Sequence, residues 1–147
     1  MWHQFLIPHL DRQRLLGQHR ECCALRGKGW GKKHATVDYV FKYATERLVA
    51  YHYLVMEEMR RRGYNPDPVW MKVNWRGNML GEEANWANSF LVEDLCSASL
   101  IYPEHDDAYL AECIALLKEK EAPIDWSVVE RDLGLVEYVE CGRVTSG

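Results

Sequence analysis

The apolar positions of this chain recur mostly at helical spacing. The strongest pattern lies in residues 44–62, where apolar side chains return every three or four positions and a basic last turn precedes Gly63, a residue typical of a helix C-cap. The apolar face of this segment consists of Leu48, Tyr51, Val55, Met56 and Met59. We therefore expect a helix here with one face buried in the core.

Two further segments predict main helices. The first runs from about residue 10 to residue 25 and ends at closely spaced glycines, with Glu21 and Gly17 lying opposite its more apolar side. That side consists of Leu15, Leu16, His19, Cys22 and Cys23. The other runs from about Pro103 to Glu121, with acids in its first turn and a stripe of Leu110, Ile114 and Leu117.

The remaining segments carry weaker signals. Residues 64–81 are rich in Pro, Gly, Asn and Trp and are typical of a loop, residues 82–95 have a weak helical pattern, and a short helix is expected after Asp125. No strong alternating pattern indicates a strand. The prediction is an all-α fold, a compact bundle of about three main helices with long irregular connections. Residues 1–147 are expected to form a single domain with an acidic tail, 127–147.

Composition narrows the class of protein. The chain has 147 residues, 48% of them apolar, and its apolar runs are too short to span a membrane. Its start lacks the basic region of a signal peptide, so we expect a cytoplasmic protein with no membrane partner. We also expect a monomer. Five cysteines and six histidines occur without metal-ligand spacing. We therefore expect reduced thiols, Cys22 and Cys23 facing the core, and no metal site.

The charge is distributed unevenly along the chain. Residues 1–62 hold 12 Lys and Arg against 6 Asp and Glu, whereas the net charge of the whole chain is −4. Within residues 12–33 a single acid, Glu21, is surrounded by Arg12, Arg14, Arg20, Arg26, Lys28, Lys32 and Lys33. Such a segment is expected of a face that binds phosphate, although a solvated basic face without a partner explains the charge equally well.

Glu21 itself has two interpretations. It is either a surface acid paired with Arg14 or Arg20, which is the more common situation, or a proton-transfer group beside a nucleic-acid backbone that the arginines hold. The residues alone favour the structural interpretation.

A family resemblance favours the second interpretation. The stretch from Leu15 to Glu21, Leu-Leu-Gly-Gln-His-Arg-Glu, resembles the Arg-Glu helix of the endonuclease-V-type pyrimidine-dimer DNA glycosylases. Residues 33–39, residues 56–65 and the stretch from Tyr102 to Trp126 resemble later segments of that family in the same order. The resemblance covers about residues 1–126.

The resemblance implies a chemistry. The family removes a damaged base and then cleaves the strand, attacking the sugar C1′ with the N-terminal amine to form a Schiff base, without metal or cofactor. An α-amine suits this task because its ordinary pKa is about 7.7–8.0, so a useful fraction of it is unprotonated and nucleophilic near neutral pH. The bulky Trp2 should prevent methionine removal, so the nucleophile would be the amine of Met1. Glu21 would then be the catalytic glutamate and Arg20 would hold phosphate near the lesion.

Other residues of the basic segment are candidates for contact with damaged double-stranded DNA. These are Arg12, Arg14, Arg26, Lys28, Trp30, Lys32, Lys33 and His34. Trp30 either stacks on or wedges between bases, or folds back into the core, and the two are equally supported. For His34 a structural hydrogen bond is the better-supported role.

The chain also departs from the family pattern. No arginine precedes Arg12, and whether His3 replaces the family's early arginine stays open. The region after Trp126 is acidic where the family's tail is basic, which implies weaker non-specific DNA affinity and leaves the preferred lesion open.

Two other classes of function compete with the enzyme. One is a non-catalytic module that binds nucleic acid with the basic face of residues 12–33. The other is a helical interaction protein whose partner surface would be formed by Trp70, Trp75 and Trp86.

Overall fold

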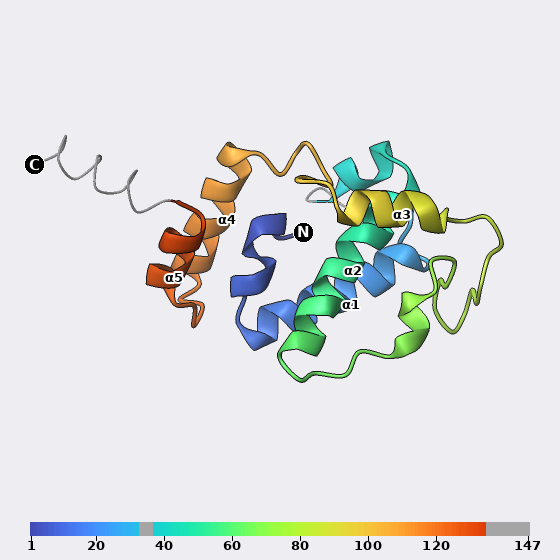
Figure 1. The fold of residues 1–147 in the computed structure, drawn as a ribbon, viewed down its shortest axis with the longest axis horizontal. Helices are drawn as coiled ribbons and strands as arrows, with labels where there is room; N and C mark the ends of the chain where they lie inside the picture. The colour runs from blue at the N-terminus through green and yellow to red at the C-terminus, as the bar shows by residue number, and fades with distance from the viewer. Residues whose placement is uncertain (33–36, 135–147) are drawn as a thin grey trace, which may run out of the picture.

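The computed structural model describes residues 1–32 and 37–134 (Figure 1). Lys33 and His34 lie outside the described residues, as does most of the predicted acidic tail. The α-helices and shorter 3-10 helices follow the order η1 Gln4–His9, α1 Arg12–Arg26, η2 Asp38–Lys42, α2 Thr45–Arg61, η3 Pro68–Met71, α3 Ser89–Cys96, α4 Asp107–Glu119 and α5 Trp126–Asp132.

The all-α prediction is confirmed. Within residues 1–32 and 37–134 no strand is formed, and the only sheet-like pairing is an isolated antiparallel bridge between Trp75 and Glu82. Helices α1 and α2 agree with their predicted spans to within about two residues. The 3-10 helices were not predicted, because so short a helix presents too few residues for a period to be recognised. None of the described helices is long and apolar enough to cross a membrane.

Capping side chains decide where the other helices begin. Helix α4 starts at Asp107, later than predicted, because the Asp106 carboxylate accepts a hydrogen bond from the Tyr109 N–H at 2.8 Å. Helix α3 occupies only the second half of its predicted segment, since Asn88 caps it by accepting from the Leu91 N–H at 3.1 Å. The local hydrogen bonds of two short polar side chains thus override the weaker apolar pattern around them.

Helix α2 is the centre of the molecule. It packs against α1, α3 and the N-terminal η1 segment, while α4 and α5 lie together at one end (Figure 1). The predicted apolar face of α2 is fully buried, and His52 and Glu58 are buried as well. A helix covered on several sides has to bury polar side chains too, so their partners become part of the fold.

The N-terminal segment is an integral part of the core. Leu6, Ile7 and Leu10 are at most 2% exposed, and Met1 and His3 are also buried. The first ten residues therefore do not trail from the surface, and they carry the start of the chain into contact with α1, α2 and α4.

The glycine-rich turn after α1 is required by close backbone packing. The Gly29 N–H donates to the carbonyl of Ala24 at 2.9 Å, and a Cβ at Gly29 would lie 2.7 Å from that oxygen. Gly17, by contrast, lies in the middle of α1, where an added Cβ would meet only the end of the Arg20 side chain at 3.7 Å.

We predict opposite effects of alanine at these two glycines. Gly29→Ala should lower the free energy of unfolding by about 1–3 kcal/mol, because backbone has to move to accommodate the methyl group. Gly17→Ala should raise it by about 0.5–1 kcal/mol, since alanine reduces the entropy lost on helix formation. Urea unfolding of both variants checks this, and equal effects would contradict the packing seen at Gly29.

Candidate active site

The start of the chain and helix α1 meet at a pair of opposite charges. The Met1 amine lies 3.7 Å from Oε1 of Glu21, and the Glu21 side chain is 38% exposed while the Met1 side chain is buried. The amine is thus held by an anchored residue, and the carboxylate next to it remains open to a ligand. A potential nucleophile and a potential general base therefore lie side by side.

Two hollows lie beside this pair: Glu21 lines both of them, and Met1 lines the second. The first, which we call the basic groove, has a volume of about 320 Å³ and is lined by Trp2, Gln13, Arg14, Gly17, Gln18, Arg20, Glu21 and Lys120. The second, which we call the Tyr109 pocket, has a volume of about 480 Å³ and is lined by Met1, Trp2, Gln18, Glu21, Tyr109, Glu112, Cys113 and Leu116. Trp2, Gln18 and Glu21 form the wall shared by both.

The predicted basic residues separate into different environments. Arg20 is exposed beside Glu21, and Arg14 lines the same groove while its guanidinium also pairs with Asp11 at 3.2 Å. Arg12 is exposed, and its guanidinium lies over the ring of Tyr64 at 5.3 Å from the centroid. Lys28 and Lys32 are exposed in the turn after α1, away from both hollows.

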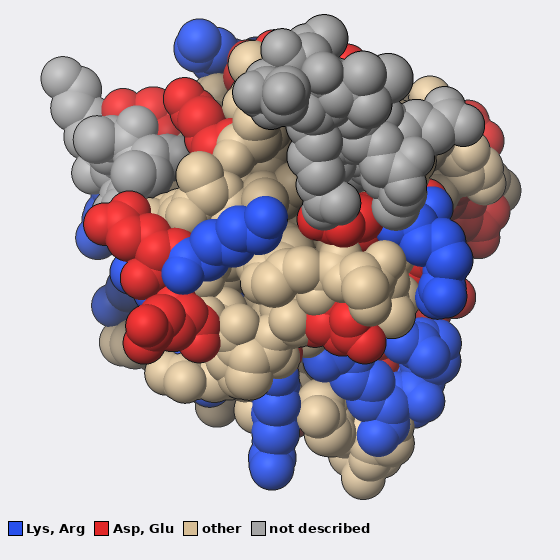
Figure 2. All heavy atoms as spheres, turned by 90° about the vertical axis from the view of Figure 1, so that its left-hand side faces the viewer, with Lys and Arg blue, Asp and Glu red and all other residues tan. Residues whose placement is uncertain are grey.

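The surface charges are also more mixed than the sequence halves suggest. Figure 2 shows acidic and basic side chains interleaved on the face that carries α4 and α5, with basic side chains gathered towards its lower right edge. Lys120, which follows α4, brings a cation from the acidic half of the chain into the basic groove. Folding thus assembles the groove's charge from both halves.

Arg26 corrects one prediction. Its side chain is fully buried, and its guanidinium donates to the carbonyls of Trp70, Lys72 and Trp75 at 2.7–3.1 Å. Burial lowers the pKa of Arg26 to about 10, which still leaves the group charged at neutral pH. Arg26 therefore organises the chain around η3 and is not available to contact DNA phosphate.

Trp30 packs inward. Its ring makes edge-to-face contacts with Phe41 and Trp86 at centroid distances of 5.1 and 5.7 Å, and it is only partly exposed. Of the two interpretations of Trp30, the structure favours the core residue over the DNA wedge. Trp86 is buried and Trp70 and Trp75 are half-buried, so these tryptophans do not form an exposed partner surface.

Histidines and tyrosines support the start of the chain from beneath. His105 Nδ1 accepts from the Gln4 N–H at 3.0 Å, so its proton is on Nε2, which donates to the Tyr39 hydroxyl at 2.7 Å. The Tyr109 hydroxyl donates to the Met1 carbonyl. Buried His3 accepts from the Phe5 N–H at 3.0 Å and is 1% exposed, so it does not take the place of a DNA-contacting arginine.

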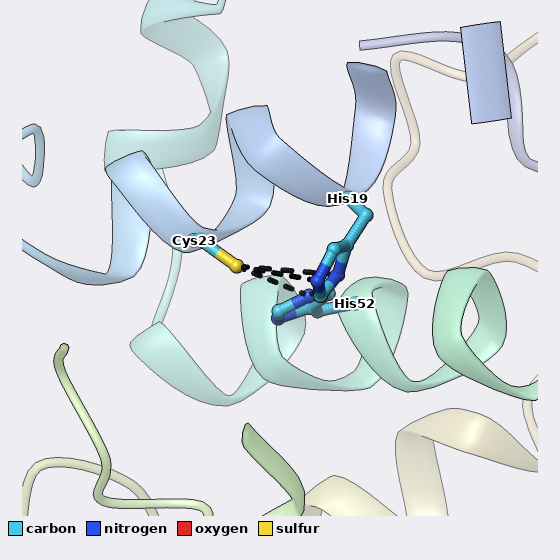
Figure 3. Close-up of side chains that lie close together, drawn as sticks. All are labelled: His19, Cys23 and His52. Carbon is cyan, nitrogen blue, oxygen red and sulfur yellow. Dashed lines mark hydrogen bonds between the residues drawn. The ribbon is translucent and has the colours of Figure 1, made fainter. Parts of the chain in front are cut away.

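A second cluster lies between α1 and α2. His19, Cys23 and His52 point towards one another (Figure 3), and their nearest ligand atoms lie within 4.8 Å of one another. This possible ligand set was missed because His52 belongs to a different helix. Burial raises the pKa of Cys23 to about 12 despite nearby Arg26, so its thiol is neutral. Cys22 is buried and Cys23 half-buried, in line with core-facing thiols.

Arg26 argues against a metal ion in this cluster. Its Nη1 lies 3.0 Å from His52 Nδ1 and can only donate, so the proton of His52 is on Nε2, facing His19 Nδ1 at 2.8 Å. A metal would need the lone pair of that Nε2, which would move the proton to Nδ1 against the guanidinium. The fixed positive charge of Arg26 would also repel a cation. That the chain has no metal site stays a prediction, now with a geometric reason.

The geometry defines a class: an all-α protein with its amino terminus paired to a helix carboxylate beside a basic groove. A family model described as pyrimidine dimer DNA glycosylase matches residues 1–72 of the chain. This match, over just under half of the 147 residues, confirms the resemblance. The general function of that family is the removal of damaged bases in DNA repair. No curated protein and no solved structure matches the chain.

The match includes part of the site only. Met1, Gln18, Arg20 and Glu21 lie inside residues 1–72, whereas Tyr109 and Lys120 lie outside. The resemblance over residues 73–126 stays an expectation. The sequence analysis did not identify Gln18, Tyr109 or Lys120 as site residues. The only signal for any of them was the positive charge of Lys120, which follows the apolar stripe of α4.

We predict that Arg26 and Arg20 have separable roles. Arg26→Gln should lower the free energy of unfolding by about 3 kcal/mol or more, because a fully buried side chain loses its charged hydrogen bonds to three carbonyls. Arg20→Gln should leave stability within about 0.5 kcal/mol of the parent and reduce the salt dependence of duplex binding by about one phosphate contact. Urea unfolding and binding at several salt concentrations check both. If Arg26→Gln were as stable as the parent and its duplex binding depended less on salt concentration, Arg26 would have to be counted among the residues that contact phosphate.

We predict that acid destabilises the protein already between pH 6.5 and 5. Burial, the main cause, lowers the pKa of His105 to about 3 and that of His52 well below 6.5. Below pH 6.5 the unfolded chain therefore binds protons that the folded chain refuses. This contribution to the free energy of unfolding is fully present above the histidine pKa of the unfolded chain, about 6.5. As the pH is lowered below that value, the free energy of unfolding falls by about 1.4 kcal/mol per pH unit for each histidine.

Urea unfolding at half-unit pH steps measures this slope above the range in which carboxyl groups titrate. A free energy of unfolding that stays constant from pH 6.5 to 5 would mean that these histidines accept protons in the folded protein.

Proposed function

We propose that this protein is a DNA-repair glycosylase with abasic-site lyase activity on damaged duplex DNA, and that the N-terminal amine is its nucleophile. The observation that carries the proposal is the 3.7 Å approach of the Met1 amine to Glu21 beside the basic groove. The family match over residues 1–72 supports the same chemistry. We propose that the enzyme works in the cytoplasm as a monomer, without metal or cofactor.

The reaction begins with attack of the amine's lone pair on C1′. At a damaged nucleotide the bond between C1′ and the base nitrogen breaks, and the base leaves with its electrons and takes up a proton. The C1′–O4′ bond of the resulting aminal then breaks as the nitrogen lone pair forms the C=N bond, and O4′ takes up a proton. At an abasic site the aldehyde oxygen leaves as water. Both routes give a protonated Schiff base between the Met1 nitrogen and C1′.

Glu21 serves the steps on either side of this intermediate. It assists opening of the sugar ring, and its carboxylate then removes a proton from C2′. The electrons of that C–H bond form a double bond, the C3′–O bond breaks, and the 3′ phosphate leaves with the electron pair. A carboxylate within reach of the amine and 38% exposed can meet both demands.

The basic groove positions the backbone. Arg20 and Lys120 are exposed cations that line the groove together with Glu21, and Arg14 lines it from the first turn of α1. We propose that they hold the phosphates that flank the lesion, while the more apolar Tyr109 pocket receives the deoxyribose. The preferred lesion is a pyrimidine dimer or another damaged base that unstacks readily.

Borohydride trapping on duplex DNA with an abasic site tests the proposal. The purified protein, with its amino terminus established as Met1 by intact mass, should give a covalent adduct, and a variant extended by two residues before Met1 should not. Glu21→Gln should still form the adduct but cleave the strand about 10²–10⁴ times more slowly, since the proton acceptor is lost.

The matched control is Glu57→Gln, an exposed acid on α2 that lines a different hollow, and it should behave as the parent. Salt-sensitive DNA binding without adduct or cleavage would instead identify a non-catalytic binding module. Absence of both binding and adduct would leave an interaction protein that shares only a sequence pattern with the glycosylases.

A further inference from the structure

The peptide groups next to the amine are held by side chains from three helices. The Trp2 N–H donates to Gln18 Oε1 on α1 at 2.8 Å, and the Trp2 carbonyl accepts from the Tyr51 hydroxyl on α2 at 2.5 Å. The Met1 carbonyl accepts from the Tyr109 hydroxyl on α4. The position of the amine is therefore set by side chains far from it in sequence.

Gln18 differs from the two tyrosines because it also binds the carboxylate. Its Nε2 donates to Glu21 Oε1 at 2.9 Å, and this is the oxygen that faces the Met1 amine. The orientation of the amide is dictated by its partners, since the Trp2 N–H can only donate and an ionised carboxylate can only accept. The residue is 3% exposed, so water has little room to replace either hydrogen bond.

We propose that Gln18 is a positioning residue for the reaction, which rests on the function proposed above. Its amide bridges the peptide that carries the amine and the carboxylate that serves it, and so sets their separation. A displacement of about 1 Å in such a pair is enough to cost about a hundredfold in rate. Although Gln18 lines both hollows, it is only 3% exposed, so we assign its effect to Glu21 and Trp2 and not to direct contact with substrate.

A purely structural role for Gln18 predicts different behaviour. If it only satisfied buried hydrogen-bonding groups, replacing it would lower stability but would change amine reactivity and cleavage by the same factor whether or not Glu21 were present. A positioning role requires coupling, so the loss should be large with Glu21 and small with Gln at position 21.

The experiment is a double-mutant cycle with Gln18→Met and Glu21→Gln, alone and together. The first readout needs no DNA: reductive methylation of the Met1 amine by formaldehyde and cyanoborohydride, followed by peptide mass spectrometry. Gln18→Met should change the labelling rate about tenfold in the parent and less than about twofold in the Glu21→Gln background. Equal changes in the two backgrounds would overturn the proposal.

The second readout is single-turnover strand cleavage at saturating abasic-site DNA. Gln18→Met should slow cleavage about a hundredfold with unchanged binding, again only when Glu21 is present. Tyr51→Phe removes the hydrogen bond to the Trp2 carbonyl and a 3.2 Å contact with Gln18 Oε1, but it leaves the bond from Gln18 Nε2 to Glu21, so it should slow cleavage much less. Equal slowing by Gln18→Met and Tyr51→Phe would mean that only the hydrogen bonds to the Trp2 backbone matter, and it would contradict a role for the Gln18–Glu21 bond.

Gln18→Glu keeps the protein testable if Gln18→Met does not fold. It is isosteric and retains an acceptor for the Trp2 N–H, but it places an oxygen against Glu21, so cleavage should recover as the pH falls and the two carboxyls share a proton. A pH profile unchanged from the parent would contradict the bridge. If the parent neither traps nor cleaves DNA, the proposed function fails, whereas the amine-labelling cycle still decides whether Gln18 couples the amine to Glu21.

Discussion

The anchoring of the N-terminal segment among α1, α2 and α4, with Met1, His3, Leu6, Ile7 and Leu10 buried, is the constraint on which the site depends. An amino terminus is usually the most mobile part of a chain, yet here Met1 and Leu6 are core residues and the Trp2 peptide is bound on both sides. The entropy of ordering the segment is offset by apolar burial, with its polar groups paired by Gln18, Tyr51 and Tyr109. An amine whose neighbouring peptide groups are held in this way is kept close to Glu21.

A second buried group organises the other side of α1. Arg26 turns inward because the chain around η3 presents three carbonyls that have no helical or sheet partners, and a guanidinium has enough donors to satisfy them all. The same side chain fixes the tautomer of His52 and, through it, the hydrogen bond to His19. Helix α1 thus uses one arginine for structure and leaves Arg20 at the groove, although both belong to one basic segment.

Much of the fold and the centre of the site could be predicted from the sequence. The helical period identified α1, α2 and α4, because a repeating apolar face is a property of local geometry. The motif that ends in Glu21 directed attention to the carboxylate that lies 3.7 Å from the Met1 amine, and the family resemblance directed attention to the amine. Gln18 was not identified, because a polar residue near the apolar side of a helix has no pattern that distinguishes a buried bridge from a solvated side chain.

The sequence by itself determined the helices, the apolar face of α2 and the identity of the charged residues near Glu21, since all of these follow from neighbouring positions along the chain. Only the tertiary structure decided which basic side chains are exposed to a ligand. Arg26 is buried and donates to carbonyls about 45 residues away, whereas Lys120, from the acidic half of the chain, lines the same groove as Arg20. The closeness of Met1 to Glu21 was decided in the same way. Burial and hydrogen-bond pairing depend on contacts between residues that are distant in sequence, and these contacts cannot be read from the pattern of neighbouring positions.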